Sequence, residues 1–463
     1  MDKNDIMPFH LFNHQGNHYM INIENMRASS VEEIDAQTLN MIVTEPKVSL
    51  TAGLEADLKR LELIFEAGEK SRKTARRESF SLVKMMLFLT QSCNLKCTYC
   101  YGDGGKYGAG GSMDEKTAFQ AVDWLLEQSG KMKKLHICFL GGEPLLKFPL
   151  MKAVVDYAEK RVPEAEKEVD FEVITNATLL DDEKITFIKE HGLSVAVSFD
   201  GPKAVQDAQR PYANGEGSYD STVPKIKKLL AVLPEASAHA VIVGDTGPQL
   251  VKEALQKIGF AEITITPASK SLFAAEPGKT NPARDTWHLL RELEQESETW
   301  IRLTRSRDAA ALRSLMTRSG LYQGLISLLH NRKRLYACDA GLRVAGVSCA
   351  GDVYLCHRFV GRDEYKLGSI FAKDLNREVY QKSPTTDNAV CAPCFARYYC
   401  AGGCKHDHAG STGSAALPSE DLCRLRCREL ELAAAVICRL SPEDRTFLIE
   451  NHIFTPKPCP LDF

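Results

Sequence analysis

The chain has 463 residues, enough for two or three domains with at least one large core. Its formal net charge of −3, with 26% charged residues, excludes the basic excess that would indicate nucleic acid as the main partner. No apolar run approaches the roughly 20 residues that cross a bilayer, and the polar N-terminus lacks the apolar segment of a signal peptide. We therefore expect a cytoplasmic protein without a membrane partner, whose fifteen cysteines mainly bind metal rather than form disulfides.

Residues 1–80 form the first expected domain. The segment His10–Ile23 is typical of a β-hairpin that turns near Gly16, and Leu54–Ala67 has the periodicity of a helix. The basic stretch Lys70–Arg77 that follows has the composition of a solvated linker to the next domain.

Residues 81–270 alternate short β-branched runs with amphipathic helical patterns, which predicts repeated βα units and a parallel sheet. The predicted strands are Val83–Thr90, Leu135–Leu140, Val169–Thr175, Leu193–Phe199, Ala238–Val243 and Ile263–Pro267. Helices are predicted between them, over Glu115–Gln128, Met151–Arg161, Asp182–His191, Thr222–Leu233 and Gln249–Ile258. Because the loops at the carboxyl ends of such strands share one crevice, we expect the chemistry there.

Three cysteines with C-x3-C-x2-C spacing, Cys93, Cys97 and Cys100, follow the first predicted strand. A structural iron–sulfur cluster or zinc site normally takes four protein ligands, so a set of three thiols leaves one metal position for another molecule. A Gly-Gly-Glu-Pro sequence at residues 141–144 follows the second predicted strand, at the same end of the sheet. The two motifs together indicate catalysis rather than a closed structural site.

These motifs, in this order, resemble those of the radical S-adenosylmethionine (SAM) enzymes. In that family the three thiolates hold a [4Fe-4S] cluster whose fourth iron binds SAM, and reduction releases a 5′-deoxyadenosyl radical. The resemblance implies a partial (β/α)6 barrel over residues 81–270. It also implies cofactor contacts at the methionine, ribose and adenine groups, made by Tyr99, Gly141, Gly142, Glu143, Pro144, Thr175, Asn176, Ser198, Asp200 and Arg210.

Two of these residues have a defined expected partner and a structural alternative. Tyr99 is expected near the adenine, although an aromatic residue at this position could equally just pack the loop. Arg210 is expected at the methionine carboxylate, because its planar fork suits that group, with a surface salt bridge as the alternative.

A second group of cysteines follows a charged helical segment, Arg284–Leu329, within an expected bridge over residues 271–335. Four of these cysteines have C-x2-C-x5-C-x3-C spacing, for which a zinc knot is the structural alternative. Together with three outlying cysteines and Gly351, they resemble the SPASM domain, the auxiliary-cluster module of peptide and protein maturases, over residues 336–430. The resemblance implies two further [4Fe-4S] clusters, a distal one on Cys391, Cys394, Cys400 and Cys423 and a nearer one on Cys338, Cys356 and Cys404.

The nearer set has one thiol fewer than fully ligated members, which carry an additional cysteine a few residues before the position of Cys338. Cys349 is a candidate to close this set; otherwise an open iron could bind a substrate thiolate. Cys427 is a candidate substitute for Cys423. The remaining cysteines are interpreted as small apolar residues or are given no role: Cys138, Cys438 and Cys459.

Other features bear on the substrate. Residues 1–80 resemble the small winged-helix-like domain with which many peptide-modifying members hold a leader peptide, with a plain packing extension as the alternative. His357 stands where sulfatase-maturing relatives have an aspartate, which argues against that substrate class. Candidates for proton transfer lie beside the cysteines: Asp103, His357, His406, Asp407 and His408.

The sequence therefore predicts an enzyme with three [4Fe-4S] clusters and SAM, ending in a C-terminal helix and tail over residues 431–463. We expect it to abstract hydrogen from a ribosomally synthesised peptide and install a thioether crosslink. Carbon–carbon crosslinking, formylglycine formation and epimerisation stay open, and a non-catalytic iron–sulfur carrier or zinc-knuckle module is the rival of another class. The expected partners are a precursor peptide and a flavodoxin- or ferredoxin-type reductant.

Overall fold

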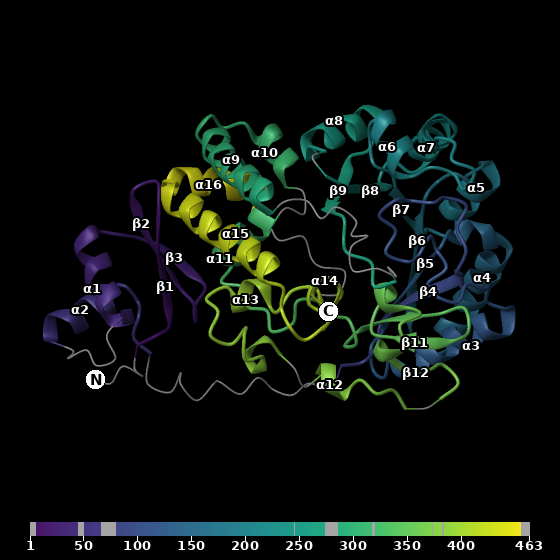
Figure 1. The fold of residues 1–463 in the computed structure, drawn as a ribbon, viewed down its shortest axis with the longest axis horizontal. Helices are drawn as coiled ribbons and strands as arrows, with labels where there is room; N and C mark the ends of the chain where they lie inside the picture. The colour runs from purple at the N-terminus through teal and green to yellow at the C-terminus, as the bar shows by residue number, and fades with distance from the viewer. Residues whose placement is uncertain are drawn as a thin grey trace.

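The computed structural model describes residues 6–44, 51–65, 80–244, 246–273, 286–316, 320–372, 374–381 and 384–454. Figure 1 shows a small N-terminal module, a barrel sheet flanked by helices and, between them, a helical and cysteine-rich part. The predicted linker Lys70–Arg77 and the tail with Cys459 lie outside the described residues. None of the helices in the described ranges combines the length and hydrophobicity that crossing a membrane requires.

The N-terminal module is an antiparallel sheet of β1 (Phe9–His14), β2 (Asn17–Asn22) and β3 (Arg27–Val31), packed on α1 (Glu33–Thr44) and α2 (Ala52–Arg60). The register of β1 and β2, with His14 opposite Asn17, confirms the predicted hairpin. The predicted helix Leu54–Ala67 is wrong at its C-terminal end. It stops at Arg60, because Glu62 turns the chain with a φ of 55° and Ile64 then bridges to Ile6.

Six parallel strands form the barrel sheet in chain order: β4 (Lys84–Thr90), β5 (Lys134–Gly141), β6 (Glu168–Thr175), β7 (Ser194–Ser198), β8 (Ser237–Ile242) and β9 (Glu262–Pro267). The intervening helices are α3 (Glu115–Gln128), α4 (Phe148–Glu164), α5 (Asp182–Glu190), α6 (Lys203–Gln209), α7 (Tyr219–Val232) and α8 (Pro248–Ile258). This arrangement confirms the predicted partial (β/α)6 barrel.

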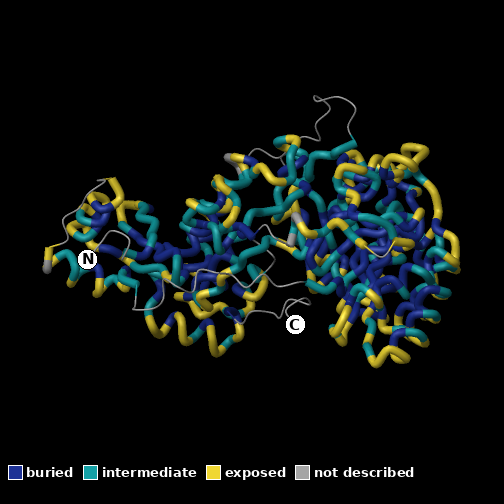
Figure 2. Tube along the Cα trace, turned by 90° about the horizontal axis from the view of Figure 1, so that it is seen from below, coloured by how far each residue is buried: buried dark blue, intermediate teal, exposed yellow. Residues whose placement is uncertain are grey.

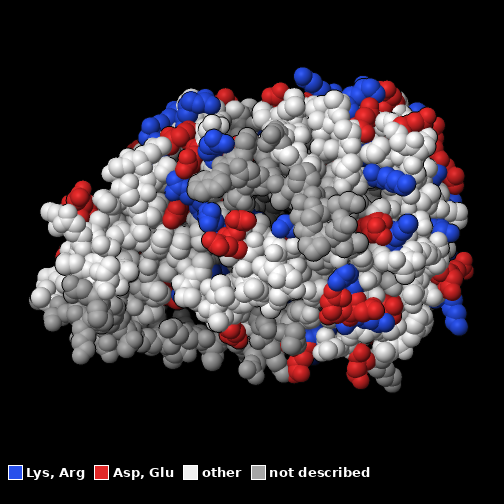
Figure 3. All heavy atoms as spheres, in the orientation of Figure 1, with Lys and Arg blue, Asp and Glu red and all other residues white. Residues whose placement is uncertain are grey.

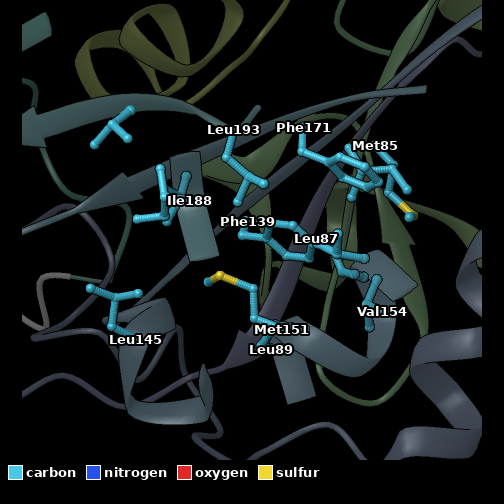
Figure 4. Packing of buried hydrophobic residues seen from close by; sticks show 14 of the residues in the cluster. Met85, Leu87, Leu89, Phe139, Leu145, Met151, Val154, Phe171, Ile188 and Leu193 are labelled. Carbon is cyan, nitrogen blue, oxygen red and sulfur yellow. The ribbon is translucent and has the colours of Figure 1, made fainter. Parts of the chain in front are cut away.

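The pleat of the strands separates the outer core of the barrel from its interior. Leu87 on β4 and Phe139 on β5 pack outward against helix residues such as Met151, as Figure 4 shows. The alternate residues Phe88 and Leu140 point the other way and form a smaller apolar layer inside the barrel. The carboxyl ends of the strands, just beyond this layer, are therefore the floor of the site.

The barrel sheet continues past β4 into the cysteine-rich part. β10 (Val344–Val347) pairs parallel with β4, and β11 (Asp352–Tyr354) and β12 (Lys366–Ser369) follow antiparallel. The order of the nine strands is β12-β11-β10-β4-β5-β6-β7-β8-β9. The predicted domain over residues 336–430 thus contributes three strands to the sheet of the barrel.

A second core lies between the longer helices α9 (Thr286–Arg305), α11 (Gly320–Leu329) and α15 (Glu420–Arg439). It buries Trp300, Leu321 and Leu430, and Ile21 of β2 joins it, so one face of the N-terminal sheet packs on this part. The helix α15 runs across the boundary predicted at residue 430. The remaining elements are α10 (Ala309–Leu315), α12 (Glu378–Gln381), α13 (Arg397–Cys400), α14 (Lys405–Thr412), α16 (Pro442–Glu450), and the 3-10 turns η3 (Pro144–Lys147), η4 (His357–Phe359), η5 (Asp363–Tyr365) and η6 (Thr385–Asp387).

Figures 2 and 3 show how burial and charge are distributed. In Figure 2 the buried segments concentrate in the barrel and along the contact between the N-terminal sheet and the helical part. On the face drawn in Figure 3, acidic and basic side chains are interspersed rather than gathered into a field of one sign. This distribution agrees with the small net charge of the chain.

Candidate active site

A cavity of about 1630 Å³ opens at the carboxyl ends of the barrel strands. The three motif cysteines, the Gly-Gly-Glu segment and the ends of β6 to β9 line it on the barrel side. Residues of α9, such as Leu289, and of α15, such as Leu425, line it on the opposite side. The cavity therefore has room for a ligand in the barrel and for a larger molecule beside it.

The loop that follows β4 carries the three cysteines of the first motif. Burial raises the pKa of the Cys93 thiol to about 12 and that of Cys97 to about 11. Three donors point at these sulfurs: the Leu95 N–H lies 3.4 Å and Asn176 Nδ2 3.8 Å from the Cys93 Sγ, and Arg210 Nη1 lies 3.8 Å from the Cys97 Sγ. Three thiols on one cavity wall, with N–H donors to the sulfurs, are a donor set that fits an iron–sulfur cluster, which would deprotonate them on binding.

The Gly-Gly-Glu-Pro segment lies against this loop so closely that its first two residues must be glycine. A Cβ on Gly141, whose φ is 134°, would lie 2.4 Å from the Thr90 carbonyl oxygen, and one on Gly142 would lie 1.8 Å from the Ser92 carbonyl oxygen. Pro144, which is buried, then begins the turn η3. The segment therefore presents the backbone of residues 141–143 directly beside the cysteine loop.

Glu143 is the acid at the centre of this wall. Its side chain is 1% exposed and accepts hydrogen bonds from the Leu145 N–H at 3.0 Å, the Thr175 hydroxyl at 2.7 Å and the Asn176 N–H at 2.8 Å. Burial raises its pKa to about 7, although these hydrogen bonds oppose the shift. Three sequence-predicted residues, Glu143, Thr175 and Asn176, thus meet at one buried carboxyl group that its hydrogen-bond donors hold in place.

A second buried network joins Tyr99, Asp200 and Arg210. The Asp200 Oδ2 accepts from the Tyr99 hydroxyl at 2.7 Å and from Arg210 Nε at 3.0 Å, and the guanidinium lies over the Tyr99 ring at 5.3 Å. Asp200 is 0% and Arg210 7% exposed, so Arg210 is not in a surface salt bridge. Ser198 lies at the end of β7 on the same cavity wall.

The nearer auxiliary set, Cys338, Cys356 and Cys404, is brought together in space. Burial, reinforced by the neighbouring thiols Cys404 and Cys338, raises the pKa of Cys356 to about 12. Cys349 lies elsewhere: its thiol donates to Gln91 Oε1 at 3.0 Å, beside the loop after β4. This position does not favour Cys349 as the fourth ligand of the nearer set. Its role as a ligand stays a prediction.

The distal set contains five thiols rather than four. Cys400 lies close to Cys423 and Cys391, and Cys394 shares a hydrogen bond with Cys427, which lowers the pKa of Cys394 below its ordinary value. Cys423 and Cys427 are four residues apart on α15 and therefore on one face of that helix. The structure thus places both Cys423 and Cys427 near the other three thiols, and which of the two would bind a cluster stays a prediction.

The N-terminal module contacts the loop of this distal set. The ring of His10 stacks on Phe395 with a centroid distance of 3.5 Å, one residue beyond Cys394. Glu24, in the turn after β2, pairs with Arg397 at 2.7 Å and accepts from the Tyr398 hydroxyl at 3.3 Å. Sequence reasoning gave no sign of this interface.

The proton-transfer candidates occupy different environments. His357 lines the cavity, and burial lowers its pKa to about 3, whereas Asp103 is exposed at the tip of the loop after Cys100. His406 is buried, with its Nδ1 3.7 Å from the Asp407 Oδ1. His408 hydrogen bonds to the Gly402 carbonyl oxygen at 2.7 Å and does not line the cavity.

The sequence reasoning missed two residues between the first motif and the nearer set. Arg358 Nη1 lies 3.4 Å from the Cys404 Sγ, Nη2 pairs with Asp407 at 3.0 Å, and the guanidinium lies over the Tyr101 ring at 5.3 Å. Tyr101 directly follows Cys100, so these two side chains connect the two thiol sets. Both residues lie within two positions of a motif cysteine, and this proximity in sequence could have identified them as site candidates.

Comparison with known proteins agrees with this geometry. The family model of the radical SAM superfamily matches residues 87–258. The chain is 38% identical over 134 residues to the uncharacterized protein MJ0907 of Methanocaldococcus jannaschii, which covers 29% of this chain and 44% of that protein. It is 24% identical over 348 residues to the cysteine-type anaerobic sulfatase-maturating enzyme of Clostridium novyi, covering 71% of this chain and 88% of that protein.

Two solved structures have the same fold. Native anSMEcpe with bound AdoMet superposes with a TM-score of 0.63 at 20% identity, covering 76% of this chain and 98% of that chain. Streptococcus suis SuiB bound to precursor peptide SuiA superposes with a TM-score of 0.52 at 14% identity, covering 90% and 98%. The family match, the fold and the site together define a radical SAM domain in this chain. Residues 87–258 of this chain belong to the radical SAM superfamily, as the sequence motifs predicted.

Proposed function

We propose that the protein is a peptide maturase that binds three [4Fe-4S] clusters and SAM and installs a thioether crosslink in a ribosomally synthesised peptide. The observation that carries this proposal is the shared cavity. It reaches from the three-cysteine motif to α15, past His357 and Arg358 beside the nearer thiol set. The fold shared with SuiB in its peptide-bound form supports a peptide as the substrate.

When bound on the three thiolates, the [4Fe-4S] cluster and SAM supply the 5′-deoxyadenosyl radical. Glu143 would receive the methionine ammonium, because its carboxyl group is buried and fixed by three donors. Arg210, which Asp200 and Tyr99 hold in place, would bind the methionine carboxylate, and Tyr99 would lie near the adenine. Thr175 and Asn176 keep Glu143 in place, and Ser198 contributes a hydroxyl from the neighbouring strand end.

The auxiliary thiol sets hold the other two clusters in this proposal. Cys391, Cys394, Cys400 and Cys423 bind the distal one, with Cys427 beside them, and the three thiols of the nearer set leave one iron for a substrate thiolate. The N-terminal module recognises the leader of the peptide, and a flavodoxin- or ferredoxin-type protein delivers the electron. A thioether requires the loss of two hydrogens and two electrons: one hydrogen would leave carbon as an atom to the 5′-deoxyadenosyl radical, the other would leave sulfur as a proton, and the remaining electron would pass to the nearer cluster.

The test begins with anaerobically purified protein. Three clusters require roughly 12 iron per chain, and a colourless zinc protein would eliminate the proposal. The reduced protein should cleave SAM, and Cys97→Ala should abolish cleavage, whereas the matched variant Cys438→Ala, on the α15 face toward β3, should retain it.

Identification of the product requires a peptide. We propose to co-express the enzyme with each short cysteine-containing reading frame beside its gene and to analyse the peptides by mass spectrometry. A loss of two hydrogens per bond, with fragmentation that locates the bond at a cysteine sulfur, is the expected result. Detection of formylglycine, a D-residue or a carbon–carbon bond would instead show that the protein is a peptide maturase with a different product. SAM cleavage without any modified peptide would refute the peptide substrate.

A further inference from the structure

The barrel sheet ends at β9, and no strand in the described residues pairs with its outer edge. The Ala268 N–H donates to the Ile242 carbonyl oxygen at 3.0 Å, and the register places Ile242 opposite Pro267. In a parallel pair, successive residues direct their backbone groups alternately to the two sides of the strand. Thr264 and Thr266 therefore face β8 with their backbone, while Ile265 and Pro267 direct theirs to the outer edge.

This outer edge borders the cavity of the active site. Residues 264–267 of β9 line it, and Leu289 and Leu293 of α9 line it from the other side. Ile265 packs its side chain toward the outer core of the barrel, so the alternate side chains of Thr264 and Thr266 point to the barrel interior. A further strand would lie about 4.8 Å from β9, inside the space that these residues enclose.

Pro267 is consistent with an open outer edge at β9. A proline within a sheet is confined to edges, because it has no N–H to donate to a neighbouring strand. At position 267 the missing N–H would have pointed to the outer side, so the pairing with β8 is intact. The edge therefore offers one donor, the Ile265 N–H, and two acceptors, the carbonyl oxygens of Ile265 and Pro267, next to the radical site.

We propose that the substrate peptide binds as an additional β-strand on the outer edge of β9. This inference rests on the proposed function and specifies how the peptide lies. The Ile265 N–H donates to a peptide carbonyl, and the Ile265 and Pro267 carbonyls accept from two peptide N–H groups. Main-chain pairing of this kind gives affinity with little demand on sequence.

The geometry also selects which peptide residues can react. Side chains of an extended strand alternate between the two faces, so every second peptide side chain lies on the face of Thr264 and Thr266 and points into the barrel. The residues between them point away from the cysteine motif. The sequence positions of hydrogen abstraction in one bound peptide therefore differ by an even number, as in i, i+2 and i+4.

The experiment uses the iron-loaded enzyme with SAM and without reductant, so that binding is measured without turnover. The probe is the synthetic core segment of the peptide that co-expression shows to be modified, made unmethylated and with a single N-methyl group at each position in turn. N-methylation removes a backbone donor and leaves the side chain unchanged. We expect alternate positions to weaken binding about three- to tenfold and the positions between them, the matched controls, to have little effect.

The phase of this pattern reports the direction of the peptide. If binding is weakened by N-methylation at the modified residue and at every second residue from it, the peptide strand is parallel to β9. If binding is weakened at the positions between these, the strand is antiparallel. Hydrogen–deuterium exchange resolved to single residues provides the measurement on the enzyme itself. The unmethylated peptide should slow exchange at the Ile265 amide, with less effect at the Thr264 amide, which already faces β8.

Two results overturn the proposal. One is a set of N-methyl effects without a period of two residues, and the other is an Ile265 amide that the peptide does not protect or that is already protected in its absence. In either case a peptide that is still modified leaves the proposed function standing. If no peptide is modified at all, it is the proposed function that fails.

Discussion

The substitution Asp200→Asn tests the buried network of Tyr99, Asp200 and Arg210, on the cavity wall proposed to bind SAM. It replaces a carboxylate that is 0% exposed by a neutral amide of almost the same shape. Arg210, 7% exposed, then loses the charge that its Nε contacts at 3.0 Å, and the Tyr99 hydroxyl loses a charged acceptor at 2.7 Å. Removal of one partner from a buried ion pair costs about 3–5 kcal/mol, because the other charge is left uncompensated.

We expect the free energy of unfolding of the barrel to fall by this amount, measured as the urea midpoint by far-ultraviolet circular dichroism under anaerobic conditions. SAM affinity, measured by equilibrium dialysis, should fall at least tenfold, because Tyr99 and Arg210 lose the group that orients both. The matched control is Asp220→Asn, whose side chain is 76% exposed and pairs with Lys203 at the surface. If Asp200→Asn unfolds at the same urea concentration as Asp220→Asn, the reasoning about this network is wrong.

Two further predictions concern other charged contacts. Burial opposes the ionisation of Glu172, but the hydrogen bond with His136 and the charge of Lys84 outweigh it and hold its pKa well below the ordinary 4.5. A depressed carboxyl pKa stabilises the fold above pH 4.5, and this stabilisation is lost as the pH falls below that value. Glu172→Gln should therefore lower the free energy of unfolding at pH 7 by about 1–3 kcal/mol and by a smaller amount at pH 3, where part of the stabilisation is already lost. Urea midpoints at the two pH values will show this difference, and equal losses would contradict it. Glu24→Gln should weaken the contact with Arg397 and speed hydrogen–deuterium exchange in β1 and β2 several-fold, whereas unchanged exchange would show that this pair does not hold the N-terminal module.

Local patterns in the sequence predict the barrel well. Each of the six predicted strands overlaps an observed one, because alternation of β-branched runs and amphipathic helices is encoded within each βα unit. The motif of Cys93, Cys97 and Cys100 and the acid Glu143 meet at one cavity, since both follow parallel strands at the same end of the sheet. The partial barrel and its site thus follow from short stretches of sequence read in order.

Long-range contacts account for what sequence reasoning missed. β10 has four residues, too few for a periodic signal, and only its pairing with β4 makes it part of the barrel sheet. The position of Cys349 beside Gln91 depends on that pairing, 258 residues apart in sequence. Glu24 and Arg397 are 373 residues apart in sequence, so no local pattern can predict their contact.

The continuous sheet also limits how this enzyme can be controlled. β4 leads into the loop of Cys93, and Cys356 follows β11, which is joined to β4 through β10, so both cysteine loops leave one continuous hydrogen-bonded sheet. A hinge motion between the barrel and the cysteine-rich part would have to break the hydrogen bonds between β10 and β4, so the separation of the two thiol sets is fixed once the chain has folded. In the proposed enzyme, clusters bound to these two thiol sets would therefore keep a constant distance for electron transfer, and control would act on access to the cavity.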